Sequence, residues 1–516
     1  MKKINILYIV LLSLFAISCD SYLDETPDNR AEVDSQIKIR KLLVSAYSEG
    51  SPTLVTELSS DNIIDMGSSN PNTTRFYEQL ANWESVTETD NDDPKSAWEA
   101  SYGAIANSNE ALAAIEKLGS ENLLPEKGEA LITRAYAHFV LVNVFCKHYN
   151  SQSSATDLGI PYMEKSETTL NPKYERGTVK EVYEKINADI EAALPLISDD
   201  MYEVPAYHFT KKAAYAFAAR FNLYYEQWQK AKDYASTVLT VNPATLLRSW
   251  DDLGALPRSP GPVTNAYINN SANLLVQTDG SNLGLYFGAY YTGSRFNHSR
   301  KIADEETLFA PAPWGGVASS AYHLRPFVYS GNNLDKTLFM KIPYLFEYTD
   351  PVAGIGYRRT VVVPFTTDET LLVRAEAEVM LGENDLAMTD LNTWSKNFFV
   401  DKETTLEAVN TFYSNLPYST ADVPTQKKVL NPKFTLAAGV QENLIHYVLQ
   451  CRRILTLHEG LRWFDIKRYG IEINRQQIQS DGTTAIVLDV LKVDDLRRAI
   501  QLPQDVIDAG LVSNPR

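Results

Sequence analysis

The residue types that could do chemistry in this chain are arranged for binding more than for bond cleavage. None of the seven histidines shows HExxH spacing, and no cysteine pair supports a zinc site. The sequence has no GxSxG nucleophile elbow, no P-loop and no GxGxxG after a strand. We therefore expect no metal, no cofactor and no catalytic residues. Glycoside hydrolysis stays open as an alternative, because it needs only two carboxylates among many acids.

Aromatic residues in irregular segments are the leading candidates for a binding site. The sequence contains 29 Tyr and 7 Trp. Flat rings stack on the apolar faces of sugars, while nearby Asn and Arg hydrogen-bond the hydroxyl groups. Trp314, flanked by proline and glycine, is the first candidate platform. The second cluster is Tyr286, Phe287, Tyr290, Tyr291, Arg295 and Asn297, and the third is Arg75, Tyr77 and Trp83. For each ring the alternative is that it packs a loop onto the scaffold.

The N-terminal residues predict a lipid-anchored protein. Two lysines precede an apolar run over residues 4–17, which is too short for a permanent membrane span but fits a secretory signal. The run ends at Ser18-Cys19, and a small residue before cysteine suits cleavage that leaves an acylated cysteine at the new N-terminus. We predict a lipoprotein signal peptide over 1–18, lipidation of Cys19 and a flexible tether over 19–35. The alternative is an ordinary signal peptide with a chance cysteine.

The net charge limits the classes of binding partner, and the cysteine content indicates whether disulfides form. The net charge of −17 argues against nucleic acid and other polyanions and leaves a neutral ligand open. Apart from Cys19, only Cys146 and Cys451 remain, and both fall in apolar helical segments. We expect them to be buried thiols rather than a disulfide.

Helical periodicity predicts the elements that must position these aromatic residues. Amphipathic helices are expected from about residue 37, from Pro94, and over 129–147 and 179–196. The acidic run at 90–93 lacks the glycine and distal Glu of a calcium loop, so we interpret it as the cap of the helix that Pro94 opens.

Two later stretches resemble each other and indicate a helical repeat. Ala219 is followed twelve residues later by Ala231, and Ala375 is followed at the same interval by Ala387. Small residues at these offsets let antiparallel helices approach closely, as in tetratricopeptide-type repeats. An ordinary helical hairpin is the alternative.

Two irregular regions interrupt these helices. One runs over residues 62–93, and the other, at about 250–369, is rich in Gly, Pro, Asn, Ser and Tyr, with a short strand expected at 359–365. Long irregular stretches in a compact chain usually carry function.

The segment 459–470, EGLRWFDIKRYG, resembles the EGxRxxDLxRxG signature of the SusD/RagB family. Further matches follow in order along nearly the whole mature chain: 130–136 with 159–161, 210–219, 373–378 and 500–506. In the signature, Glu459, Arg462, Asp465 and Arg468 recur every three residues. We interpret them as a structural charge ladder along one helix face, without a binding role.

The resemblance implies a mainly α fold, in which a tetratricopeptide-like helical hairpin scaffold carries a large irregular loop-rich lobe and a few short strands. It implies a single SusD-like domain over 36–516, with helical repeats mainly over 37–245 and 369–470 and a variable loop lobe over about 250–368. The family's glycan-binding residues share no motif, so none is transferred to this chain.

The same resemblance implies a function. Members of the family are outer-membrane, cell-surface lipoproteins that capture an oligosaccharide ligand and deliver it, without cleaving it, to a SusC-like TonB-dependent transporter. Two alternatives stay open: a surface glycoside hydrolase, and a repeat scaffold that binds protein or peptide ligands.

Overall fold

The computed structural model describes residues 32–516 except 71, 90, 168–171, 316–317, 332–333 and 483. The predicted signal peptide, Cys19 and most of the predicted tether lie outside the described residues. Within the described part, no helix combines the length and the apolar character that crossing a bilayer requires.

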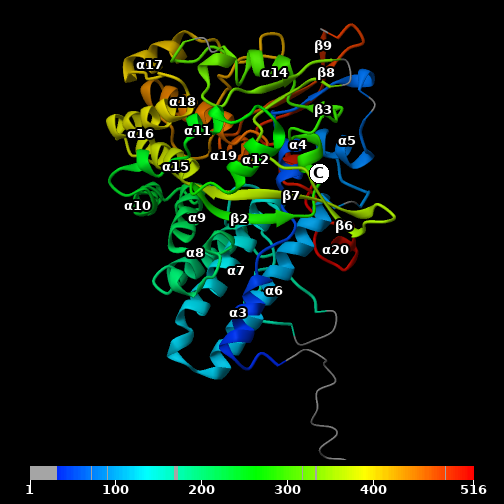
Figure 1. The fold of residues 1–516 in the computed structure, drawn as a ribbon, viewed down its shortest axis with the longest axis vertical. Coiled ribbons are helices and arrows are strands. Elements are labelled where there is room, and N and C mark those ends of the chain that lie inside the picture. Colours follow the sequence, from blue (N-terminus) through cyan, green and yellow to red (C-terminus); the bar gives the residue numbers. More distant parts are fainter. Residues whose placement is uncertain are drawn as a thin grey trace, which may run out of the picture.

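Paired helices form an arc from the bottom of the molecule to its upper left (Figure 1). Neighbours along the chain pack against each other from α6 to α8, and α10 then packs on α15. The helices of this arc are α3 (Gln36–Val44), α6 (Pro94–Leu118), α7 (Leu124–Phe145), α8 (Val179–Ala193), α9 (Lys211–Tyr224), α10 (Trp228–Leu239), α15 (Thr367–Met380), α16 (Asn384–Phe398), α17 (Leu406–Asn415) and α18 (Val440–Leu455). The predicted mainly helical fold is therefore confirmed.

The predicted cap at Asp93 and the predicted cysteine states are also confirmed. The Asp93 carboxylate accepts a hydrogen bond of 2.6 Å from the Ser96 N–H, so this acid caps α6 as expected. Cys146 and Cys451 are buried free thiols.

Small residues explain the close approach of the repeated helix pairs. Ala219, Ala231, Ala375 and Ala387 are all fully buried, and they belong to the pairs α9–α10 and α15–α16. Because α10 also packs on α15, the two pairs form one continuous helical stack although more than a hundred residues separate them. The predicted hairpins are present at the predicted positions.

In the described part of the chain, strands of the irregular regions and two C-terminal strands form three small sheets. The first sheet has the order β2-β7-β6, with β2 at Asn273–Asp279, β7 at Ile355–Thr366 and β6 at Leu345–Asp350. The second has the order β3-β1-β8-β9, with β3 at Phe296–Asn297, β1 at Ile64–Asp65, β8 at Ile473–Ile478 and β9 at Ala485–Leu491. The third pairs β4 (Phe327–Tyr329) with β5 (Lys336–Leu338). The strand expected at 359–365 is the second half of β7. Together β6 and β7 form a ribbon that projects from the body (Figure 1).

Short helices occupy parts of these regions and of the connections elsewhere in the chain. They are α4 (Thr53–Ser59), α5 (Arg75–Ala81), α11 (Trp250–Ala255), α12 (Pro260–Ile268), α13 (Leu283–Tyr286), α14 (Arg300–Glu305), α19 (Arg462–Arg468) and α20 (Gln504–Asp508). Single 3₁₀ turns lie at Gly67–Ser69, Glu121–Leu123, Asp199–Met201, Pro205–Tyr207, Pro243–Thr245, Ser319–Ala321 and Leu496–Arg498.

The signature segment is buried and structural, but the predicted charge ladder is wrong in detail. Gly460 has φ +76°, which breaks the helical path, so Glu459 lies before α19 and pairs with Lys341 instead. Arg462 pairs with Asp61, from a distant part of the chain, at 2.8 Å. Only Asp465 and Arg468 contact each other, at 3.3 Å. The charges therefore join α19 to other elements and do not form a row along one face.

We expect Gly460→Ala to destabilise the protein by about 2 kcal/mol or more. The left-handed backbone at Gly460 is costly for alanine, and an added Cβ would lie 2.3 Å from Thr56 Oγ1. Denaturant unfolding measures the loss. Gly103→Ala in helix α6 is the control, because an added Cβ there meets nothing within 4 Å. Equal stability of Gly460→Ala and the parent protein would contradict the steric argument.

Candidate functional site

Trp314 is a packing residue in the structure, and the expectation that its ring is exposed is wrong. The side chain is 7% exposed. Its ring centroid lies 4.7 Å from that of Phe399 and 5.5 Å from that of Tyr447, so residues at the end of α16 and within α18 cover it. The ring thus anchors its loop to the helical stack.

The aromatic members of the third cluster are also buried, which corrects their predicted exposure. Trp83 is 4% exposed, the Arg475 guanidinium lies 4.8 Å from its ring centroid, and its Nε1–H donates to the Ser59 carbonyl at 2.8 Å. Tyr77 is buried, with its ring 5.1 Å from that of Tyr286. These rings hold the segment that includes α5 against its neighbours. Arg75, at the start of α5, is exposed.

Arg295 and Asn297 hold loops together, and only Arg295 stays partly exposed. Arg295 donates two hydrogen bonds to Asp65, at 2.7 and 2.9 Å, and a third of 2.9 Å to Glu78. Asn297 is fully buried in β3, and its side-chain amide donates to the Ser294 carbonyl. Asn297 is therefore buried, whereas the sequence prediction places it at an accessible binding surface.

The structure brings the two irregular regions together. The Asn70 amide donates to the Ser294 carbonyl at 2.8 Å, and the Asn72 amide donates to the Gly293 carbonyl at 2.7 Å. The backbone N–H of Arg295 in turn donates to the Asn72 carbonyl at 3.0 Å. The second and third predicted clusters are therefore adjacent in space, while Trp314 packs separately on α16 and α18.

An exposed tyrosine ladder, consisting of Tyr291, Tyr290 and Tyr344, lies beside this junction. The Tyr291 and Tyr290 rings stack with centroids 4.7 Å apart and planes at 27°, and Tyr290 packs on Tyr344 at 4.7 Å and 39°. Tyr291 is 68% exposed, whereas the other two rings are half-buried. Since Tyr290 covers one face of Tyr291, the opposite face is the one that solvent reaches.

Polar groups accompany the ladder. A hydrogen bond with Tyr291 is the main cause that raises the pKa of Tyr290 above its ordinary value of 10.0. The Tyr290 hydroxyl therefore stays protonated at neutral pH and can donate a hydrogen bond. Arg358 of β7 is exposed and donates to the Asn282 side-chain oxygen at 2.8 Å, which fixes a guanidinium near the rings.

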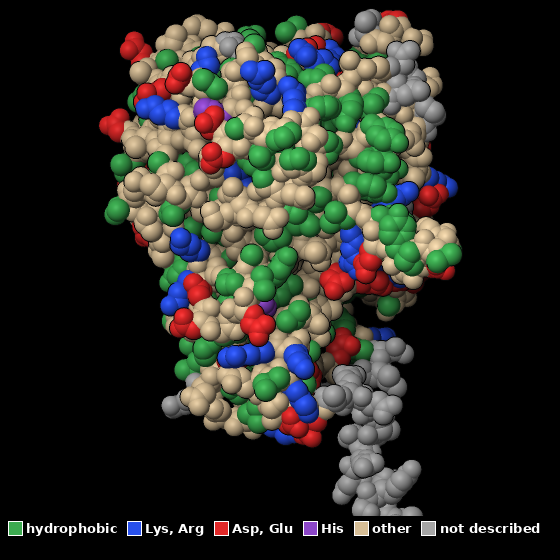
Figure 2. Space-filling view, in the orientation of Figure 1, with side chains coloured by type: hydrophobic (Ala, Val, Ile, Leu, Met, Phe, Trp, Pro, Cys, Tyr) green, Lys and Arg blue, Asp and Glu red, His purple; other side chains and the backbone are tan. Residues whose placement is uncertain are grey.

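Sequence reasoning missed Tyr344 and Arg358. The available signal was the alternation of Tyr344, Phe346 and Tyr348, which is typical of a strand with one aromatic face. Figure 2 shows hydrophobic side chains, among which tyrosine is counted, gathered on the projecting β6–β7 ribbon and on the surface above it. Tyr344 and the ribbon therefore extend the predicted Tyr290–Tyr291 cluster into a larger exposed aromatic surface.

Among known families, a SusD-like model described as "Starch-binding associating with outer membrane" matches residues 21–223. Among curated proteins, the SusD-like protein P38 of Formosa agariphila is 22% identical over 501 residues, which cover 90% of this chain and 91% of that protein.

Solved structures share the fold. A SusD superfamily protein from Bacteroides thetaiotaomicron superposes with a TM-score of 0.63 at 18% identity, covering 93% of this chain and 99% of the other. A SusD-like carbohydrate binding protein from Bacteroides vulgatus gives a TM-score of 0.63 at 16% identity, with 91% and 95% of the chains covered. The resemblance predicted from the sequence is therefore confirmed: a SusD-like family model matches residues 21–223, and the curated relative and the solved structures similar to this chain are SusD-like proteins.

Proposed function

We propose that this protein is a non-catalytic glycan-binding lipoprotein of the cell surface, which captures oligosaccharides and delivers them to a TonB-dependent outer-membrane transporter. The observation that carries the proposal is the exposed tyrosine ladder at the junction of the two irregular regions. The description of the matching family, starch binding and association with the outer membrane, supports both the ligand class and the location.

The ladder suits a neutral sugar chain. The open face of Tyr291 offers an apolar surface on which one sugar ring can stack. Tyrosine hydroxyls and the Arg358 guanidinium supply donors for the hydroxyl groups of neighbouring units. The net charge of −17 disfavours acidic polymers, so a neutral glycan fits best.

The lipid anchor at Cys19 and the transporter belong to the same proposal. A surface protein that binds glycan weakly gains from being tethered beside an import channel, because the tether raises the local concentration of ligand at the channel. Acylation of Cys19 would supply the membrane attachment, since the described residues contain no spanning helix.

We expect Tyr291→Ala to weaken oligosaccharide binding about tenfold, because the ring supplies stacking area worth about 1–1.5 kcal/mol. Isothermal titration against a panel of neutral oligosaccharides measures the affinity. Tyr207→Ala is the matched control: Tyr207 is also a solvent-facing tyrosine, 51% exposed, but it lies in the 3₁₀ turn before α9.

The outcomes separate the alternatives. Unchanged affinity in Tyr291→Ala would remove the ladder from the binding site, and no binding to any glycan would favour a scaffold for protein or peptide ligands. Recovery of shortened oligosaccharides after long incubation would favour a glycoside hydrolase.

A further inference from the structure

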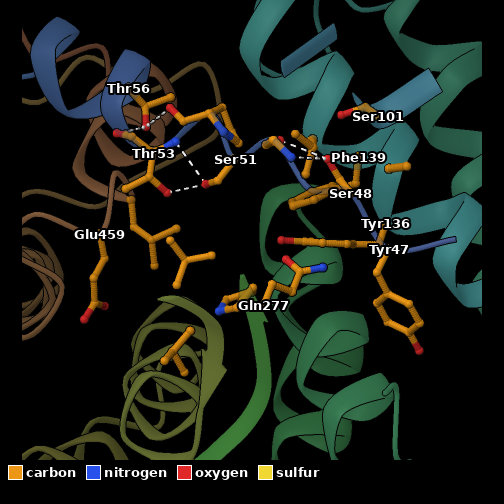
Figure 3. Close-up of a pocket in the computed structure, with 18 of the residues that line it drawn as sticks. Tyr47, Ser48, Ser51, Thr53, Thr56, Ser101, Tyr136, Phe139, Gln277 and Glu459 are labelled. Atoms are coloured by element: carbon orange, nitrogen blue, oxygen red, sulfur yellow. Dashed lines mark hydrogen bonds between the residues drawn. The ribbon is translucent and has the colours of Figure 1, made fainter. Parts of the chain in front are cut away.

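A second candidate site lies inside the molecule. A cavity of about 100 Å³ separates α6 and α7 from the strands β2 and β7 and from the turn before α19. Figure 3 shows Gln277 reaching into this space from β2, with Tyr47 and Tyr136 on one side and Glu459 on the other. We call this space the central pocket. It is separate from the exposed tyrosine ladder, none of whose residues line it.

Four buried polar atoms of the lining have no hydrogen-bond partner in the described part of the chain. They are Ser101 Oγ, Tyr224 Oη, Gln277 Nε2 and His458 Nε2. An unpaired buried donor or acceptor is costly, so such groups are normally satisfied by protein, water or a ligand. Four of them around one cavity indicate that the pocket is built to hold a polar molecule.

The charges in the lining are already paired. Lys341 donates to Glu459 at 2.7 Å, and the Tyr267 hydroxyl donates to the same carboxylate oxygen at 2.9 Å. Arg220 contacts Glu369 at 3.0 Å. Burial lowers the pKa of His458 well below its ordinary value, so this ring is neutral. A charged ligand would find no unpaired counter-charge here and would have to be desolvated, so the pocket favours a neutral one.

The walls and the volume restrict the ligand further. Apolar side chains such as Phe139, Val140 and Val362 form much of the surface and can pack on the face of a ring. A cavity of about 100 Å³ restricts the ligand to a small molecule and excludes an oligosaccharide.

We infer that the central pocket binds a single neutral sugar or a cyclic polyol of the same size, whose hydroxyl groups hydrogen-bond Gln277, Ser101 and Tyr224. The inference stands on the pocket alone and does not depend on glycan binding at the tyrosine ladder. It adds a second, buried binding site to the one proposed at the surface.

Three substitutions test the site without removing any hydrogen bond within the protein: Ser101→Ala, Tyr224→Phe and Gln277→Leu. Since Ser101 Oγ, Tyr224 Oη and Gln277 Nε2 are buried without a partner in the described part of the chain, we expect the ligand-free variants to be as stable as the parent protein or slightly more stable. We expect each to bind the sugar about three- to tenfold more weakly. The probes are glucose, galactose, xylose and N-acetylglucosamine at millimolar concentration, with titration calorimetry and thermal unfolding as readouts.

Ser108→Ala is the matched control. Ser108 lies two turns after Ser101 on α6, and its hydroxyl is bonded to Ala104 and Thr133 instead of lining the pocket. We expect this variant to bind the sugar as the parent protein does. We expect Tyr291→Ala to keep single-sugar binding even where it loses oligosaccharide binding. The proposals for the tyrosine ladder and for the central pocket can therefore fail independently.

Three results would overturn the inference. The first is that none of the four sugars releases heat or raises the unfolding midpoint. The second is that Ser101→Ala binds as tightly as the parent protein, and the third is a crystal structure grown in saturating sugar that shows only ordered water in the central pocket.

Discussion

Arg452→Met is expected to lower the free energy of unfolding by about 3–5 kcal/mol, because it leaves a buried negative charge without its partner. Arg452 is 0% exposed. Its guanidinium lies 3.2 Å from Asp465, 3.5 Å from Glu369 and 3.9 Å from Glu376. Because methionine fills much of the same volume, the loss in unfolding free energy reports the missing charge and not a newly created cavity.

The charges around Arg452 are balanced, which is why one deletion has a large effect. Three carboxylates, Glu369, Glu376 and Asp465, face three guanidiniums, those of Arg220, Arg452 and Arg468. Burial alone would raise the pKa of Glu376, but Arg468 and Arg452 outweigh it and hold that pKa below its ordinary value. Without Arg452, three buried carboxylates share two cations.

Denaturant unfolding followed by tryptophan fluorescence measures this loss. Arg497→Met is the control: Arg497 also pairs with two acids, Asp489 and Asp495, but it is 28% exposed, so we expect a loss below about 1 kcal/mol. Equal unfolding midpoints for Arg452→Met and Arg497→Met would show that the buried cluster contributes no more than a surface pair.

The sequence predicted those parts of the fold that depend on neighbours along the chain. Helical spacing, the Asp93 cap and the paired alanines are local signals, and each element appears where it was expected. The signature was read as structural, and the burial of Arg462, Asp465 and Arg468 agrees. Its partners could not be predicted, since Asp61 and Glu376 come from distant segments.

The candidate site was harder to predict, because exposure depends on residues far away in the sequence. Trp83 and Tyr291 both lie in irregular, polar surroundings, yet only Trp83 is covered, in part by Arg475. The partner that orders the ladder, Tyr344, lies more than fifty residues beyond Tyr290. Local composition locates the irregular regions but does not indicate which of their rings face solvent.

Trp314→Ala distinguishes a packing role of Trp314 from a ligand-binding role. Because the ring is 7% exposed and packs on Phe399 and Tyr447, we expect a loss of about 3–5 kcal/mol in unfolding free energy. We expect the oligosaccharide affinity of the folded variant to be unchanged, since the tyrosine ladder lies elsewhere. Denaturant unfolding and titration calorimetry measure the two quantities independently.

Trp314→Phe completes this test. The indole Nε1–H has no hydrogen-bond partner in the described part of the chain, so phenylalanine removes no bond and keeps most of the aromatic packing. We expect it to restore most of the stability that alanine loses. If instead both variants remain stable while glycan affinity falls in each, Trp314 would be a binding residue whose ring becomes accessible when the ligand arrives, and the packing interpretation would be wrong.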